Sequence, residues 1–136
     1  MADYKVKQYI IFGMGRFGSS LARTLSQMGH EVLAVDSTEE RVAAITPYVT
    51  NAVQISINDE ESMRSLGIRN FDAAVVAIGD DLHNSILITV MCKELGAQYL
   101  IAKASDAMHA KVLVKLGVDR VVFPERDMGE RIAHSL

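Results

Sequence analysis

The chain has 136 residues, of which 49% are hydrophobic and 6% aromatic, and its formal net charge is −3. This length corresponds to one domain, and the slightly acidic balance with few aromatic residues argues against a nucleic-acid-binding protein. The longest apolar run, Ile86–Cys92, is too short to span a bilayer, and Lys5 and Lys7 interrupt the start of the chain, so we expect neither a membrane span nor a signal peptide.

Six short runs of apolar and β-branched residues alternate with helical patterns along the chain. Because these runs are nearly continuous in apolar residues, they are typical of parallel strands that are covered on both faces. The expected strands are Gln8–Phe12, Glu31–Val35, Asn51–Ile57, Ala73–Ile78, Tyr99–Lys103 and Arg120–Phe123.

Helical patterns occupy the segments between the strands, and glycines follow most of them, as is typical of helix ends. The first expected helix has Phe17, Leu21 and Leu25 on one face and ends at Gly29, and the second lies around Val42 and Ile45 and breaks at Pro47. The remaining expected helices are Glu60–Leu66, about Leu82 to Leu95, Met108–Leu116, and a last one from near Glu125 to the end of the chain.

Six strands joined by helices predict an α/β fold with a doubly wound parallel sheet. Right-handed crossovers leave few topologies, and the order 3-2-1-4-5-6 of dinucleotide-binding Rossmann folds is the first choice. Because no linker, low-complexity stretch or internal repeat interrupts the pattern, we expect residues 1–136 to form a single domain.

The turn between the first strand and the first helix carries the pattern Gly-x-Gly-x-x-Gly at Gly13, Gly15 and Gly18. The first glycine allows a tight turn, the second lets a phosphate approach the backbone, and the third lets the helix pack closely on the strand. The free amides at the start of the helix then favour a phosphate. We therefore predict a nucleotide site, with a glycine turn needed only for packing as the alternative.

Residues next to the turn and after the second strand extend this site. Arg16 stands where its guanidinium can clamp extra phosphate charge, as in a nucleoside di- or triphosphate; a solvated surface arginine is the alternative. Asp36 is expected to accept hydrogen bonds from both ribose hydroxyls and to repel a 2′-phosphate, which disfavours NADP. Ser37 and Thr38 follow it, where ligand contact and a helix N-cap can coexist.

Ligands of doubly wound sheets lie beyond the carboxyl ends of the strands, and this rule adds candidates at the later strand ends. Lys103 supplies positive charge there, and Ile78 and Gly79 are placed to flank an adenine or the sugars. No histidine, serine or cysteine pattern of a known catalytic type is present, so we expect no catalytic residue and no enzyme. The further contact candidates are Phe17, Ile55, Ser56, Ile78, Gly79, Asp80, Lys103, Ala104, Ser105, His109 (expected to face the same cleft) and Glu125.

Two helices have apolar surface that needs a partner. Ser85–Cys92 is apolar around nearly the whole helix, which predicts a subunit interface; coverage by the next helix is the alternative. Its Cys92, the single cysteine, is expected to be a buried hydrophobe and suits a reducing cytosol. Met128, Ile132 and Leu136 form a stripe up to the last residue, which suggests a longer natural chain or a partner, or else a frayed terminal helix packed on its own sheet.

The chain resembles the RCK or KTN (TrkA-N) regulatory nucleotide-binding domain of bacterial potassium transport proteins, in particular those of the Ktr and Trk systems. The resemblance covers essentially the whole chain, and the arginine inside the glycine motif is specific to that family. One departure is "ISINDEES", which lacks the Gly-Asp-Ala-Thr pattern common after the third strand in relatives. The matching stretches are "IFGMGRFGSSLARTL", "GHEVLAVD", "LGIRNFDAAVVAIG", "KELGA", "IAKA" and "LGVDRVVFPERDMGERIA".

The resemblance implies a cytosolic regulatory domain, peripheral to the inner face of the cell membrane, that binds ATP, ADP or NAD(H). It implies docking on a membrane potassium-translocating subunit, assembly as homodimers and, in the full-length protein, as a homo-octameric ring, and a C-terminal lobe after this N-terminal domain. It also implies that Glu125 lies near the nucleotide at a dimer contact, where it helps to hold a divalent cation.

Two other functions stay open. The cofactor domain of an NAD-dependent dehydrogenase would carry the same turn and acidic residue, but hydride transfer needs a substrate site and usually a general acid or base, and the six strands use the whole chain. A structural interaction module with a vestigial site is the third reading, and the intact glycines and Asp36 argue against it.

Overall fold

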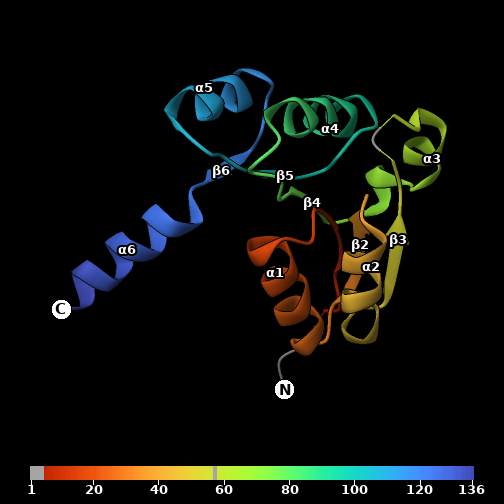
Figure 1. Cartoon of the computed structure of the whole chain (residues 1–136), viewed down its shortest axis with the longest axis horizontal. Helices are drawn as coiled ribbons and strands as arrows, with labels where there is room; N and C mark the ends of the chain where they lie inside the picture. Colours follow the sequence, from red (N-terminus) through yellow and green to blue (C-terminus); the bar gives the residue numbers. More distant parts are fainter. Residues whose placement is uncertain (1–4, 57) are drawn as a thin grey trace.

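One sheet of six parallel strands forms the centre of the molecule. The computed structural model describes residues 5–56 and 58–136, and it arranges the strands in the order β3-β2-β1-β4-β5-β6 (Figure 1). The predicted Rossmann order is therefore confirmed. The strands are β1 Gln8–Phe12, β2 Glu31–Asp36, β3 Asn51–Gln54, β4 Ala73–Val76, β5 Leu100–Lys103 and β6 Arg120–Val122.

Helices connect the strands and cover the two faces of the sheet. Figure 1 shows α1 and α2 on one side and α4 and α5 on the other. The helices are α1 Arg16–Gln27, α2 Glu39–Ile45, α3 Glu60–Ser65, α4 Leu82–Glu94, α5 Ala107–Lys115 and α6 Pro124–Ser135, with 3₁₀ turns η1 Thr46–Tyr48 and η2 Ile68–Asn70.

Two separate apolar cores lie on the two faces because successive side chains of a strand point to opposite sides. In β1, Ile11 packs into the core beneath α1 and α2, whereas Ile10 and Phe12 pack into the core beneath α3, α4 and α5. All four residues of β4 are buried. Cys92 belongs to the second core, as expected, and burial raises the pKa of its thiol to about 12.

The strand order creates a crevice at the carboxyl edge of the sheet. β1 pairs with β2 on one side and with β4 on the other. The connections that leave β1 and β4 therefore run to opposite faces of the sheet, and such a switch point is where doubly wound folds bind ligands.

Several strand ends differ from the expected ones. β4 ends at Val76 rather than Ile78 because the chain turns out of the sheet towards the crevice after Ala77, whose amide still donates to Phe12 O (2.8 Å). β6 ends at Val122 because Pro124 begins α6, and the residue before a proline is restricted. β2 extends by one residue to include Asp36, and β5 begins at Leu100 rather than Tyr99.

The region between the second and third helices also departs from expectation. β3 ends at Gln54, and the expected strand end at Ile57 lies outside the described residues. Pro47 does not break the chain out of helical structure. It lies instead within η1, because a proline in the first turn of a helix gives up no needed backbone hydrogen bond.

The last helix, α6, extends away from the sheet (Figure 1). None of its residues is buried, and Met128 and Ile132 are each 52% exposed. The alternative that this helix packs on its own sheet is therefore wrong. Within the described part of the chain, no helix combines the length and apolar character needed to cross a membrane.

Candidate functional site

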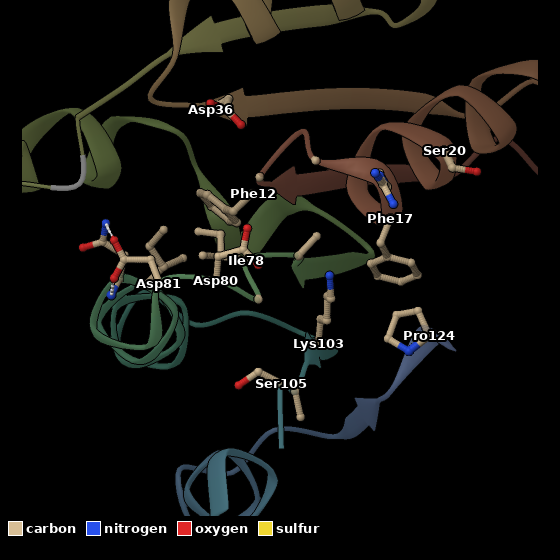
Figure 2. A pocket seen from close by; sticks show the side chains of 18 of the residues that line it. Phe12, Phe17, Ser20, Asp36, Ile78, Asp80, Asp81, Lys103, Ser105 and Pro124 are labelled. Atoms are coloured by element: carbon tan, nitrogen blue, oxygen red, sulfur yellow. Dashed lines mark hydrogen bonds between the residues drawn. The ribbon is translucent and has the colours of Figure 1, made fainter. Parts of the chain in front are cut away.

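A cleft of about 1360 Å³ opens at the carboxyl edge of the sheet (Figure 2). Small-molecule pockets commonly have about 300–1,000 Å³, so a nucleotide fits within it. Its walls come from the turn after β1, the ends of β2, β4 and β5, and the beginning of α6. The cleft thus lies at the switch point between β1 and β4.

The three glycines of the turn have different surroundings. Gly13 has φ of 98°, and a Cβ there would lie 2.9 Å from both the carbonyl oxygen of Ala77 and Cγ1 of Ile78. At Gly18 a Cβ would overlap the carbonyl oxygen of Gly13. At Gly15, by contrast, nothing lies within 4 Å of the Cβ position. Gly13 and Gly18 are therefore required by packing, whereas the space over Gly15 is open to the cleft.

The start of α1 lies beside this open space. Gly15 is its N-cap residue, the first turn has no acidic residue, and no described residue caps it with a side chain. A helix N-terminus carries roughly half a positive charge together with unpaired amides. The turn therefore presents donors and positive potential where an anion can approach the backbone closely.

Asp36 is the acidic residue at the end of β2, and its side chain is only 5% exposed. Its Oδ2 accepts the backbone amide of Met14 at 2.7 Å, and its Oδ1 accepts that of Thr38 at 2.8 Å. The carboxylate therefore ties the glycine turn to the start of α2. Each carboxylate oxygen has a further lone pair, so a ribose hydroxyl can still donate to it.

Arg41, which the sequence analysis did not include, lies next to Asp36. Its Nη1 is 3.9 Å from Asp36 Oδ2, and its side chain is 55% exposed at the rim of the cleft. An arginine at this position can receive a 2′-phosphate. Only Ser37 and Thr38, which directly follow Asp36, were expected beside it, whereas α2 brings a residue five positions later to the same place.

Lys103 supplies positive charge to the floor of the cleft. Figure 2 shows its side chain rising from the end of β5 between Ile78 on one side and Phe17 and Pro124 on the other. The side chain of Lys103 lies over Gly79, where a Cβ would be 2.9 Å from Lys103 Cε and 3.0 Å from Lys103 Nζ. The absence of a side chain at Gly79 therefore gives Lys103 its path into the cleft.

The cleft contains four positive and four negative side chains, but they differ in how they are paired. Arg41 lies near Asp36, Arg126 lies near Asp127 and Glu130, and Asp81 caps α4. Within the described part of the chain, Arg16 and Lys103 have no such ion pair. These two cations are therefore available to an anionic ligand. The charged lining residues are Arg16, Arg41, Lys103, Arg126, Asp36, Asp80, Asp81 and Glu125.

The structure brings most of the predicted contact residues together. They come from six separate segments of the sequence and meet only because the strands are parallel and end at one edge. Those that line the cleft are Gly13, Gly15, Arg16, Phe17, Asp36, Ser37, Ile55, Ile78, Gly79, Asp80, Lys103, Ala104, Ser105 and Glu125.

Four predicted contact residues do not line the cleft. Gly18 is buried under the turn, and Thr38 and Ser56 are exposed but are not among the lining residues. The expectation that His109 faces the cleft is wrong: it is 1% exposed, and its ring points into the protein towards Ser85, which lies 3.0 Å away. The rotation of α5 decides this, because one face of the helix packs against α4.

Other lining residues were not predicted as contacts. Ser20 follows Arg16 by one helical turn, a spacing that was readable from the sequence. Asn84 lies in the first turn of α4, where Asp81 accepts its backbone amide at 3.0 Å. From α6 come Met128 and Ile132, whose stripe had suggested a partner surface. The other unpredicted lining residues are Phe12, Val35, Arg41, Met63, Ala77, Asp81, Ile88, Phe123, Pro124, Arg126 and Gly129.

Glu125 lies at the rim of the cleft and is exposed. Within the described residues, no group of three or more His, Cys, Asp and Glu side chains is arranged to hold a metal ion. A cation at Glu125 would therefore need ligands from elsewhere, such as phosphate oxygens. Among the described residues that line the cleft there is also no histidine or cysteine.

Comparison with sequence relatives gives consistent matches. The family model described as TrkA-N domain matches residues 9–124. The Ktr system potassium uptake protein A of Bacillus subtilis (strain 168) is 48% identical over 136 residues, which are 100% of this chain and 61% of the relative. The Ktr system potassium uptake protein C of the same strain is 44% identical over 130 residues, 96% of this chain and 59% of the relative. The chain thus spans less than two thirds of these curated relatives.

Solved structures share the fold. The NAD(P)-binding domain of an exopolyphosphatase-related protein from Archaeoglobus fulgidus has a TM-score of 0.82 at 24% identity, over 95% of this chain and 96% of that one. The GsuK channel bound to NAD has a TM-score of 0.74 at 17% identity, over 90% of this chain and 22% of that one. GsuK bound to ADP has a TM-score of 0.73 at 17% identity, over 90% and 32%.

Proposed function

The chain belongs to the TrkA-N domain family, and from this premise we propose that it is the nucleotide-binding regulatory domain of a potassium uptake system of the Ktr or Trk type. The identity of 48% along the whole chain with a Ktr system potassium uptake protein supports the transport assignment. The proposed ligand is ATP, ADP or NAD(H); of these, NAD and ADP are the ligands named for GsuK, which shares the fold.

One observation carries the binding part of the proposal. The uncapped N-terminus of α1 faces the cleft, and the space over Gly15 is open beside it. Arg16 and Lys103 add two available positive charges, and Asp36 lies at the end of the neighbouring strand. Amides and cations suit the phosphates, and the carboxylate suits the ribose hydroxyls.

The proposed setting is the cytoplasmic face of the membrane, where the protein docks on a potassium-translocating subunit. The proposed assembly is a homodimer and, in the full-length protein, a homo-octameric ring. The exposed apolar side chains of Met128 and Ile132 on α6 support this, because a second lobe or a neighbouring subunit could cover them.

The proposed signal is the difference between ATP and ADP, which lies in the terminal phosphate alone. Arg16 at the start of α1 and Glu125 at the start of α6 line the cleft from different elements. Arg16 would pair with the terminal phosphate, and Glu125 would act through a divalent cation that offsets its repulsion from phosphate. A ligand shifts a conformational equilibrium only by contacts that differ between the two states.

Calorimetric titration of the purified chain with ATP, ADP, NADH and NADPH tests the binding part. We expect saturable binding of at least one of the first three ligands and weaker binding of NADPH. Absence of binding by all four would overturn the proposed function. The transport part is tested by potassium uptake in cells with and without the gene.

The sensing part has its own test. Arg16→Ala should reduce the preference for ATP over ADP more than it reduces binding of adenosine, and Glu125→Gln should remove any dependence of ATP binding on divalent cations. Ser19→Ala, in the same helix turn but outside the cleft lining, is the matched control. An unchanged ratio of ATP to ADP affinity in Arg16→Ala, together with identical dimer geometry in both complexes, would contradict it.

We propose a binding rather than a catalytic role. A dehydrogenase cofactor domain would use the same turn, but proton transfer at a substrate usually needs a positioned acid or base such as histidine. No histidine is among the described residues that line the cleft, and His109, which was expected there, is buried behind it. This supports a regulatory domain over a detached enzyme domain.

A further inference from the structure

A small polar cluster lies inside the protein behind the floor of the cleft. Ser85 and Thr89 on α4 are both 0% exposed, and His109 on α5 is 1% exposed. Polar groups removed from water cost free energy unless they are hydrogen-bonded. The partners of this cluster therefore indicate what it holds in place.

The ring of His109 connects two elements. Its Nδ1 lies 2.9 Å from the backbone nitrogen of Ser105 and 3.1 Å from Ser105 Oγ, and its Nε2 lies 3.0 Å from Ser85 Oγ. A backbone amide can only donate, so Nδ1 must be the unprotonated acceptor. The neutral ring therefore carries its proton on Nε2 and donates it to Ser85.

Ser105 is the residue that this bond fixes, and it belongs to the cleft. It follows Lys103 and Ala104 at the end of β5, and all three line the cleft. The next residue, Asp106, accepts the backbone amide of His109 at 2.8 Å. The turn between β5 and α5 is thus held by the ring at Ser105 and by the cap at Asp106.

We propose that His109 is a positioning residue for the nucleotide site: its Nδ1 holds the amide of Ser105 and so fixes the cleft floor from Lys103 to Ser105 before the ligand arrives. This inference rests on the proposed function of the cleft. A floor that is already ordered loses less conformational freedom on binding, which favours affinity. The histidine acts from behind the site and touches no ligand.

The competing explanation is that His109 only joins α4 to α5 through its bond to Ser85. The two nitrogens allow the explanations to be separated. In His109→Asn, the side-chain oxygen reaches the position of Nδ1 and keeps an acceptor for Ser105. In His109→Gln, the longer amide reaches the position of Nε2 and keeps the contact with Ser85. Ser85→Ala is the matched control, because it removes the bond at Nε2 and leaves the bond at Nδ1.

The three variants and the unmodified chain are titrated with ATP and ADP, and their thermal unfolding is measured in parallel. Positioning through Nδ1 predicts that His109→Asn and Ser85→Ala bind close to normally, and that His109→Gln binds about tenfold more weakly, the equivalent of one hydrogen bond. Normal binding by His109→Gln overturns the proposal. So does a loss of affinity that follows the loss of thermal stability equally in all three variants.

Nitrogen NMR of the ligand-free protein gives a readout that does not depend on nucleotide binding. We expect ring shifts typical of an unprotonated Nδ1 and a protonated Nε2, and slow exchange of the Ser105 amide in the unmodified chain and in His109→Asn but faster exchange in His109→Gln. Equal exchange in all chains overturns the positioning role. If the unmodified chain binds no nucleotide, the proposed function fails, and the amide exchange still decides whether His109 positions Ser105.

Discussion

Gly15 and Gly18 stand three positions apart in one turn, yet only one of them is required by the fold. A Cβ at Gly18 overlaps the backbone of Gly13, whereas a Cβ at Gly15 meets nothing within 4 Å. Gly15 also has φ of −75° and ψ of −162°, a conformation open to alanine. Substitution at these two positions therefore separates folding from ligand binding.

We predict that Gly15→Ala still folds but loses about 1 kcal/mol of stability, since alanine is a poorer N-cap residue than glycine. Its methyl group stands where a phosphate would meet the amides of α1, so nucleotide affinity should fall at least about tenfold, as expected for one lost charged hydrogen bond. Gly18→Ala is the matched control and should lose about 2 kcal/mol or more of stability from overpacking. Urea denaturation and calorimetry measure both. Unchanged nucleotide affinity in Gly15→Ala would contradict the phosphate assignment.

Asp36 and Arg41 influence whether the site prefers a ligand with free ribose hydroxyls, such as NADH, or one with a 2′-phosphate, such as NADPH. We predict that NADH binds more tightly than NADPH, and that Asp36→Ala narrows this difference and costs about 1.5–3 kcal/mol of affinity for ADP-type ligands. Because Asp36 also accepts the amides of Met14 and Thr38, the variant should unfold more easily as well. The NADH/NADPH ratio is therefore the informative measurement, since a loss of stability affects both ligands alike.

Arg41→Ala is the complementary variant for this pair. Its guanidinium lies beside the carboxylate and would attract a 2′-phosphate, so its removal should widen the preference for NADH. Equal affinity of the unmodified chain for NADH and NADPH would rule out the ribose role of Asp36.

At the scale of elements, the contact between α4 and α5 contains a buried neutral histidine. Burial lowers the pKa of His109 below its ordinary value of 6.5, and the nearby Asp106 carboxylate partly opposes this. Protonation would also place a hydrogen on Nδ1, opposite the amide of Ser105. The folded state therefore binds this proton less readily than the unfolded state does.

The sign of the pH effect follows from this difference. Above about pH 6.5 the contribution of His109 to stability is fully present, and as pH falls towards the lowered folded pKa it is lost, at most about 1.4 kcal/mol per pH unit for one proton. We predict a steeper loss of stability below about pH 6.5 in the unmodified chain than in His109→Gln, measured by urea denaturation. The variant keeps the other histidines and so serves as the control. Parallel pH profiles would contradict the prediction.

The apolar helix α4 is buried on one face within the chain and is partly exposed on another. Ile88, Met91 and Cys92 are buried against the chain's own sheet, whereas Ile86 and Val90 are only half-buried and Leu82 is 50% exposed. Leu82, Ile86 and Val90 are spaced four residues apart and form one stripe. The stripe is thus the part of the predicted interface that the chain itself leaves available.

At the scale of the whole molecule, we predict at least a dimer with the α4 stripe in or near the contact. A desolvated charge in such a contact is costly, so Ile86→Glu or Val90→Glu should shift the assembly towards monomer. Lys7→Glu, at an exposed position directly before β1 and outside α4, is the control and should leave the assembly unchanged. Light scattering at high and low concentration, with and without nucleotide, measures this. A monomer under all these conditions would contradict it.

The molecule as a whole is a helix-covered sheet with one helix, α6, that extends away from it. α6 begins at the cleft with Pro124 and Glu125 and then leaves the sheet (Figure 1). Met128 and Ile132 also line the cleft, yet each is 52% exposed, and Leu136 just after the helix is fully exposed. A ligand in the cleft would therefore lie next to the helix that carries this exposed stripe. This arrangement is compatible with the proposed regulatory role.

Much of this protein was determined by its sequence alone. The hydrophobic periodicity and the composition predicted the helices and strands, because both kinds of element depend on local patterns. The rule that crossovers are right-handed then predicted the strand order. The glycine turn and Asp36 were predictable as a candidate site for the same reason: the strand, the turn and the helix are adjacent in the chain. The boundaries of β2, β4, β5 and β6 differ from the expected ones by one or two residues, since pairing partners decide where a strand stops.

The tertiary structure decided where individual side chains point. His109 was expected in the cleft and lies behind it, because α5 packs its face against Ser85, 24 residues earlier in the chain. Arg41 was not expected and lies beside Asp36, because α2 folds back over the end of β2. A helix turns 100° per residue, so a small rotation set by distant packing moves a side chain from solvent to core. Local patterns contain no information about that rotation, and only the packed sheet and helices fix it.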